Sequence, residues 1–207
     1  MCPGRNHVSS MKRNRRSLRL QGYDYCSPDA YFFTACTRNR ECLFGRIRND
    51  MMCLNEFGTI VQDCWNELPG HFANVVLDAF QVMPNHVHGI FWIVDRRPDA
   101  LSMAPIPSVG MTHASSLQDR IVFAQAENLP PTRARGPRSG SVGAIVGSFK
   151  SAATRLINQA RDCPGSSVWQ YNFHERIIRT QSSLERIRRY IENNPRYWHL
   201  DRHNPDA

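Results

Sequence analysis

The sequence contains no long hydrophobic run. Its longest apolar stretch, Gly89 to Val94, is far shorter than the roughly 20 residues that a membrane-spanning helix needs. The arginine-rich start also contains no apolar segment of the kind that signal peptides carry. We therefore expect a cytoplasmic protein with no membrane partner.

Two further patterns are missing. The seven cysteines never form a Cys-x-x-Cys pair, and their odd number argues against a disulfide framework as well as a zinc knuckle. We expect reduced, mostly buried thiols. A third histidine two residues after His88 would have suggested a nucleotide-hydrolysing triad, but that position is Ile90.

Lysine is almost absent as well, although the net charge is +8 and 26 residues are lysine or arginine. All but Lys12 and Lys150 are arginines, whose planar guanidinium binds phosphate oxygens through two parallel hydrogen bonds. One group of these arginines surrounds Tyr190, which favours nucleic acid as the partner over the alternative of a solvated surface. The candidate DNA-binding residues are Arg13, Arg15, Arg16, Arg19, Arg176, Arg179, Arg186, Arg188 and Arg189.

The length and the 41% hydrophobic content fit one domain with extensions. Residues 1–20 are predicted to form a basic disordered arm. Residues 95–140 are rich in Pro, Ser, Ala and Arg without sustained periodicity, which predicts a flexible insertion. The remaining segments, 21–94 and 141–205, would then form a single catalytic domain.

Strands and helices alternate within the predicted domain. Aromatic and β-branched residues predict the strands, and apolar residues at helical spacing predict the helices. We expect a strand over 30–37, a short strand after the turn at 38–40, a helix over 55–68, strands over 73–82 and 86–94, a helix over 141–161, a strand over 168–178, and a last helix capped by Ser182 or Ser183.

The pair His86 and His88 opens the strand over 86–94. Because successive side chains of a strand point to opposite faces, both imidazoles emerge on one face while Val87 points away. Two imidazoles on one face can hold a divalent metal ion. The alternative is two polar residues exposed at a turn near a sheet edge, and spacing alone does not separate the two.

The last predicted helix carries the remaining candidates. Leu184, Ile187 and Ile191 form an apolar stripe, Tyr190 lies beside Ile187, and Asn194 follows one turn later. Pro195 should end the helix and move Asn194 away from helical geometry. On geometry alone, Tyr190 could be an amphipathic core residue and Asn194 a helix cap. Placed over a metal, the two would supply a phenolic nucleophile and an amide ligand, which suggests phosphodiester cleavage through a tyrosine.

Three separated motifs carry a family resemblance. These are Val82 to Gly89, then Val168-Trp169-Gln170 with Ile177-Ile178-Arg179, then Tyr190 to Pro195. In this order they resemble the REP-associated tyrosine transposases, which are relatives of the IS200-like single-strand transposases with a His-hydrophobic-His motif. The likeness runs from about Arg16 to Pro205. It implies an α+β fold with a ferredoxin-like core, in which helices pack mainly on one face of a four- to five-stranded antiparallel sheet and the histidines lie on a central strand.

The resemblance also implies a chemistry. His86, His88 and Asn194 would bind Mg²⁺ or Mn²⁺, and Tyr190 would attack a phosphate of single-stranded DNA. The products would be a 5′-phosphotyrosine and a free 3′-hydroxyl. The implied partner is single-stranded or hairpin DNA, such as REP-like palindromes, and the protein would act as a monomer or homodimer. The activity would be that of an endonuclease and strand transferase.

Two other functions remain open from the sequence. A module of the same fold could bind DNA or RNA through arginines and aromatic residues, such as Tyr171 and Phe173, without cutting a bond. A metal-dependent nuclease could instead use activated water, with Tyr190 serving only the structure.

Overall fold

The computed structural model describes residues 20, 22–95 and 136–207. The arm arginines Arg13, Arg15, Arg16 and Arg19 and most of the segment 95–140 lie outside these residues, so the predictions about them stay predictions. Within the described parts of the chain, no helix is long and apolar enough to cross a membrane.

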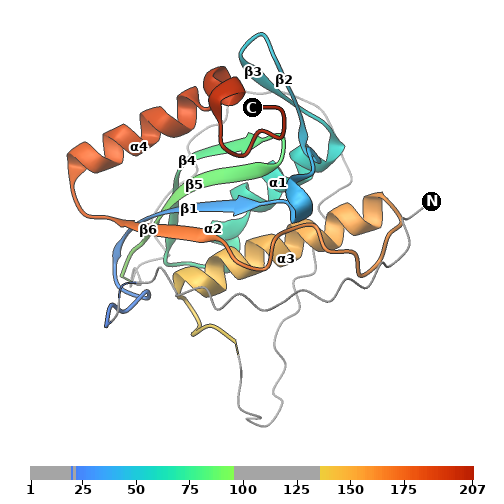
Figure 1. Cartoon of the computed structure of the whole chain (residues 1–207). Helices are drawn as coiled ribbons and strands as arrows, with labels where there is room; N and C mark the ends of the chain where they lie inside the picture. The colour runs from blue at the N-terminus through green and yellow to red at the C-terminus, as the bar shows by residue number, and fades with distance from the viewer. Residues whose placement is uncertain (1–19, 21, 96–135) are drawn as a thin grey trace, which may run out of the picture.

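The domain is built on a four-stranded antiparallel sheet (Figure 1). Its strands are β1 (Asp29–Cys36), β4 (Val75–Met83), β5 (His86–Ile93) and β6 (His174–Ile178), in the spatial order β4-β5-β1-β6. Helix α1 (Glu56–Asn66) lies between β1 and β4 in the chain, and α3 (Val142–Ala160) lies between β5 and β6. This order and connectivity confirm the predicted α+β fold with a ferredoxin-like core.

Several shorter elements lie around this core. They are the hairpin of β2 (Gly45–Arg48) and β3 (Met51–Leu54), the one-turn helix α2 (Leu68–His71), and the 3₁₀ segments η1 (Arg38–Arg40) and η2 (Pro195–Leu200). The hairpin projects from one end of the sheet beside the C-terminal segment (Figure 1).

The larger hydrophobic core fills the space between the sheet and helices α1 and α3. Trp65 of α1 stacks on Phe80 at 4.4 Å between ring centroids, and Phe33, Phe91 and Phe149 pack around the pair. Such aromatic contacts supply much of the apolar area that a small domain can bury.

A glycine follows the histidine pair for a steric reason. A Cβ at Gly89 would lie 2.5 Å from the ring of Phe33 on the neighbouring strand, a separation that packed atoms do not tolerate. The bare backbone at Gly89 therefore lets β1 and β5 pair closely directly beside His88.

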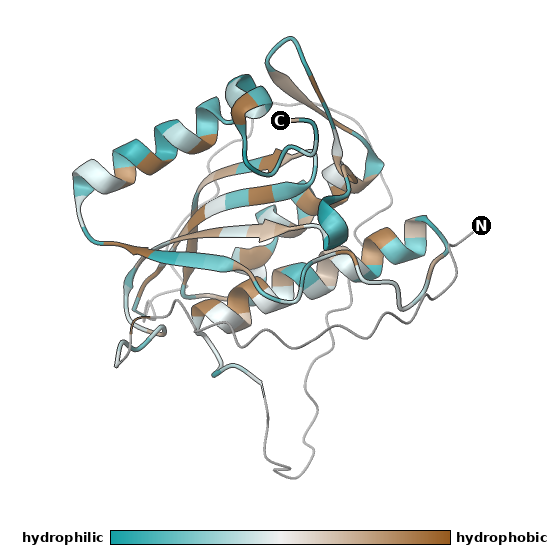
Figure 2. Ribbon diagram, viewed as in Figure 1, coloured by the Kyte–Doolittle hydropathy of each residue, from teal (hydrophilic) through white to brown (hydrophobic). Residues whose placement is uncertain are grey.

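Helix α4 (Gln181–Asn193) covers the opposite face of the sheet (Figure 1). The predicted stripe of Leu184, Ile187 and Ile191 packs on a small apolar cluster that includes Phe32 and Ile90. The outward face of α4 is hydrophilic (Figure 2). Most helical cover thus lies on one face, as expected, and α4 alone among the described helices packs on the other.

Several predicted boundaries differ from the structure. Asn55 caps α1 as expected, but α1 ends at Asn66, and α2 includes Pro69 because proline fits the first turn of a helix. The last strand begins at His174 instead of residue 168. Residues 168–173 contribute only an isolated bridge between Trp169 and Thr37.

The two ends of α4 also differ from prediction. The cap is Thr180, whose hydroxyl accepts a hydrogen bond from the Ser183 amide at 3.2 Å, so neither Ser182 nor Ser183 is the cap. Asn194 keeps helical backbone angles (φ −58°, ψ −39°), because Pro195 opens the 3₁₀ segment η2 directly after it.

The cysteines depart from the expectation of buried, reduced thiols. Cys26, Cys36, Cys42, Cys53 and Cys64 are free, but of these five only Cys64 is buried. Cys163 is disulfide-bonded, so the expectation is wrong for that residue.

One ion pair attaches α4 to the sheet edge. The register of β4 shifts between Leu77 and Phe80, and the carboxylate of Asp78 accepts hydrogen bonds from Arg188 at 2.8 and 2.5 Å and from the Trp92 indole at 3.0 Å. Partial burial acts to raise the pKa of Asp78, but these hydrogen bonds hold it below its usual value. The bulge therefore aims a charged acceptor at the helix.

Asp78→Asn should lower the free energy of unfolding by about 1 kcal/mol near neutral pH, because the half-exposed pair is partly screened by solvent. Since the pKa of Asp78 is lowered in the folded state, its contribution is complete above the usual value of about 3.9 and is lost as pH falls through the lowered value. Urea unfolding of the wild type and the variant, at neutral pH and at an acid pH below the lowered pKa of Asp78, measures this difference in free energy.

The control is Asp63→Asn, on the exposed side of α1. It should change the unfolding midpoint little at either pH. Equal losses for Asp78→Asn and Asp63→Asn, or a loss that persists undiminished in acid, would contradict the role given to the ion pair.

Candidate active site

His86 and His88 lie on β5, which has β4 on one side and β1 on the other. The pair is therefore central, as the family resemblance implies, and is not at a sheet edge. Their side chains are 0% and 1% exposed, and their Nε2 atoms are 3.0 Å apart. The structure thus buries two imidazoles in an edge-to-face arrangement, with an interplanar angle of 72°, on the side of the sheet that α4 covers.

Hydrogen bonds at the other ring nitrogens orient both imidazoles. Asn85 Oδ1 lies 2.9 Å from His86 Nδ1, while the Asn85 amide donates to the carbonyl oxygens of Arg40 and His203. Because Oδ1 can only accept, His86 Nδ1 carries the proton. Thr34 Oγ1 lies 2.8 Å from His88 Nδ1 and can accept a hydrogen bond from the N–H of that atom. In this tautomer of His88, both Nε2 atoms carry a lone pair in the gap between the rings.

The protonation state of the pair follows from its burial. Desolvation lowers the pKa of His86 to about 3, although Asp201 opposes this shift, and it lowers the pKa of His88 well below its usual value. At neutral pH both rings are neutral, and their Nε2 atoms lie within hydrogen-bond distance of each other at 3.0 Å. Two neutral imidazoles this close could both serve as ligands of one divalent cation.

A carboxylate that the sequence analysis missed completes the cluster. Asp201 Oδ2 lies 3.9 Å from His86 Nε2, and one ligand atom from each of His86, His88 and Asp201 falls within 4.8 Å of the others. Asp201 follows η2 and belongs to none of the motifs. No spacing signal marked it, because only the fold of the C-terminal segment brings it to β5.

Asn194 joins this group through Asp201. Its side-chain amide donates to Asp201 Oδ2 at 3.3 Å, and the residue is 4% exposed. Among the described residues, Asn194 Oδ1 is the buried side-chain nitrogen or oxygen without a hydrogen-bond partner. A buried orphan acceptor is rare in native proteins and needs a reason. An unpartnered amide oxygen on a residue that is hydrogen-bonded to Asp201 fits the ligand set of a divalent ion.

Tyr190 reaches the histidine pair from α4. Its hydroxyl lies 3.2 Å from His88 Nε2, and its ring stands at 5.1 Å from the His88 ring. The side chain stays 47% exposed, so one edge of the ring is open to solvent. Burial of the hydroxyl end and the charge of Asp201 raise the pKa of Tyr190, and the phenol is therefore protonated at neutral pH.

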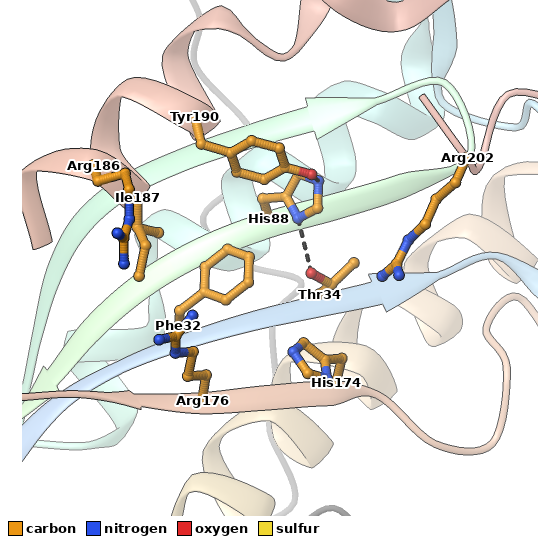
Figure 3. Close-up of a pocket in the computed structure, with 9 residues that line it drawn as sticks. All are labelled: Phe32, Thr34, His88, His174, Arg176, Arg186, Ile187, Tyr190 and Arg202. Carbon is orange, nitrogen blue, oxygen red and sulfur yellow. Dashed lines mark hydrogen bonds between the residues drawn. The ribbon is translucent and has the colours of Figure 1, made fainter. Parts of the chain in front are cut away.

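A pocket of about 320 Å³ opens beside Tyr190 and His88 (Figure 3). Its walls come from β1, β5, β6, α4 and the C-terminal segment. They are formed by Phe32, Thr34, His88, His174, Arg176, Arg186, Ile187, Tyr190 and Arg202. A phenol, two imidazoles and three guanidinium groups therefore share one solvent-accessible space.

The predicted arginine group divides by position. Arg176 and Arg186 line the pocket, and so does Arg202, which the sequence analysis did not select. The guanidinium of Arg188 is bound by Asp78 at the sheet edge. The exposed Arg179 and Arg189 do not line this pocket.

No family model matches the chain. An uncharacterized protein of Haemophilus influenzae (strain Rd) is 37% identical over 188 residues, which span 91% of this chain and 92% of that protein. This identity and coverage show common descent over nearly the whole length. The chain belongs to the same family as this Haemophilus influenzae protein.

Solved structures identify the fold. A REP-associated tyrosine transposase bound to a REP hairpin aligns with a TM-score of 0.51 and 16% identity, covering 92% of this chain and 76% of that one. The chain has the fold of a REP-associated tyrosine transposase. A candidate transposase from Deinococcus radiodurans R1 also aligns, at 16% identity over 88% of this chain and 97% of that chain, but its TM-score of 0.41 gives it no weight.

Thr34→Val should weaken Mn²⁺ binding by about tenfold or more, because it removes the acceptor that keeps the proton on His88 Nδ1. Thr34→Ser keeps the hydroxyl and should bind Mn²⁺ nearly as the wild type does. Electron paramagnetic resonance measures free Mn²⁺, and nitrogen-15 NMR of the metal-free protein reports the His88 tautomer. Equal affinities and an unchanged tautomer in the valine variant would refute the assignment.

Proposed function

We propose that this protein is a metal-dependent endonuclease and strand transferase of the tyrosine transposase type, acting on single-stranded DNA. One observation carries the proposal. The Tyr190 hydroxyl lies 3.2 Å from His88 Nε2, which itself lies 3.0 Å from His86 Nε2. A phenol from α4 and the His88 imidazole of β5 thus meet at the wall of an arginine-lined pocket, with His86 next to His88, and this arrangement suits attack of a tyrosine on a phosphate.

The proposed substrate follows from the charges around Tyr190. Arg176, Arg186 and Arg202 line the pocket, and no acidic residue does. Guanidinium groups bind phosphate oxygens strongly and without regard to base sequence. The solved transposase with the same fold is bound to a REP hairpin, which supports single-stranded or hairpin DNA as the substrate of this chain.

The proposed cofactor is Mg²⁺ or Mn²⁺. His86, His88, Asn194 and Asp201 would hold it, since they present two imidazole lone pairs, an unpartnered amide oxygen and a carboxylate. When bound, the ion would neutralise charge that develops on the scissile phosphate. The buried, neutral histidines keep their lone pairs for this purpose at neutral pH.

In the proposed reaction, Tyr190 Oη bonds to phosphorus while the bond from phosphorus to the 3′-oxygen breaks. The phenol must lose its proton, and the partly exposed Tyr190 can release it to solvent in the open pocket. The departing 3′-oxygen takes up a proton from solvent in turn. Because one phosphodiester replaces another, a 3′-hydroxyl can later reverse the attack and rejoin strands without ATP.

Tyr190→Phe should abolish the covalent protein–DNA adduct while leaving DNA binding nearly unchanged, because only the attacking oxygen is removed. The assay is capture of labelled single-stranded DNA that survives denaturation, with Mg²⁺ or Mn²⁺ present. Tyr171→Phe and Tyr197→Phe, at exposed positions, are the controls and should form adduct normally. An adduct from the Tyr190→Phe variant would assign the nucleophile to another residue.

Substitutions of the four candidate metal ligands should weaken Mn²⁺ binding to different extents. His86→Ala and His88→Ala should each abolish adduct formation and weaken Mn²⁺ binding by at least about tenfold, and a chelator should mimic both. Asp201→Asn should weaken Mn²⁺ binding more than Asn194→Ala, because a carboxylate attracts a cation more strongly than a neutral amide that water can replace. Calorimetric titration with Mn²⁺ measures all four.

His199→Ala serves as the control for these variants, because this histidine is exposed on η2. Its Mn²⁺ affinity and adduct yield should match the wild type. Undiminished adduct formation in excess chelator would contradict the proposal that the reaction depends on a metal ion.

A further inference from the structure

The pocket beside Tyr190 extends away from the candidate metal ligands. It includes His88 and Tyr190 in its wall, but His86 and Asp201 are not part of it. Its remaining walls come from β1, from β6, from α4 and from Arg202 (Figure 3). A strand of DNA with one phosphate at Tyr190 would therefore have room for its next linkage in this pocket.

Three guanidinium groups reach this space from separate parts of the chain. Arg176 comes from β6, Arg186 from α4, and Arg202 from the C-terminal segment. The ion pairs found among the described residues include none of these three. Three cations gathered without a carboxylate repel one another, and a bound anion relieves that repulsion.

The size and the lining of the pocket narrow the ligand class. A volume of about 320 Å³ is at the small end of ligand-binding pockets. Phe32 and Ile187 contribute an apolar part, and Thr34 and His174 contribute hydrogen-bonding groups. Phosphate with an attached sugar matches such a mixture of guanidinium, polar and apolar surface. Because α4 borders one side and β6 the other (Figure 3), a single strand fits better than a duplex.

We propose that Arg176, Arg186 and Arg202 form a subsite for the phosphodiester adjacent to the scissile one, and that this subsite holds single-stranded DNA in register with Tyr190. The inference rests on the proposed function for its register, while its anion-binding part stands on the pocket alone. Two consequences follow. The subsite contributes to DNA affinity, and it also fixes the distance between Tyr190 and the phosphate that it attacks.

Matched arginine variants test the subsite. Arg176→Gln and Arg186→Gln are each compared with Arg155→Gln, at an exposed position of α3 on the opposite face of the sheet. Arg176 and Arg186 line the pocket, and Arg155 lies outside it. The full chain is used throughout, and circular dichroism verifies that each variant folds.

The first measurement is binding of a mixed-sequence single-stranded oligonucleotide in chelator, across a range of salt concentrations. Each pocket variant should lower the slope of log K against log salt by about 0.7, the value for one lost phosphate contact on a single strand. Arg155→Gln should change the slope much less.

The second measurement is the rate of adduct formation at saturating DNA with Mn²⁺. Arg176→Gln and Arg186→Gln should slow it by about tenfold or more, because the phosphate is no longer held in register. Arg176→Lys should restore the salt slope, since the charge remains, but not the full rate, since lysine lacks the planar fork. The control variant should react at the wild-type rate.

The outcomes separate the subsite from the proposed function. In one outcome, the wild type forms no adduct while the pocket variants, unlike the control, still lower the slope of log K against log salt. That result supports the subsite and refutes the proposed attack by Tyr190. If the wild type forms adduct and the pocket and control variants behave alike in both measurements, the chemistry stands and the subsite is overturned.

Discussion

Burial of two neutral imidazoles at contact distance is the constraint on which the site depends. The Nε2 atoms of His86 and His88 lie 3.0 Å apart, in a setting where desolvation keeps both rings uncharged. Thr34 and Asn85 orient the two rings through hydrogen bonds at the Nδ1 atoms of His88 and His86. Titratable groups that burial holds far from their usual pKa are common at functional sites, and two uncharged imidazoles at this distance offer nitrogen atoms that can share one partner.

One face of the sheet carries most of the hydrophobic core, and the other carries the candidate site. One face carries the large aromatic core under α1 and α3, which can hold the strands rigid. The other carries a small apolar cluster under α4 and, beside it, the buried polar groups of β1 and β5. Helix α4 carries Tyr190 from this thinner layer, so the position of the phenol depends on few contacts, among them the ion pair of Asp78 with Arg188.

Local patterns determined most of the architecture. Alternating or aromatic-rich runs predicted the four strands of the sheet, and the stripe of Leu184, Ile187 and Ile191 predicted the buried side of α4. These predictions hold because side-chain periodicity and backbone propensity act over a few residues. Boundaries were less accurate where caps compete, as at Thr180, because several nearby hydroxyls can serve the same amide.

The sequence by itself determined that His86 and His88 share a face, since strand geometry fixes that relation. Only the tertiary structure decided that Asp201 and Arg202 join them, because the C-terminal segment reaches β5 and the pocket through contacts remote in sequence. The tertiary structure likewise removed Arg188 from the pocket and kept Arg186 in it. Periodicity identifies the face of a single element, but convergence of separate elements depends on how they pack.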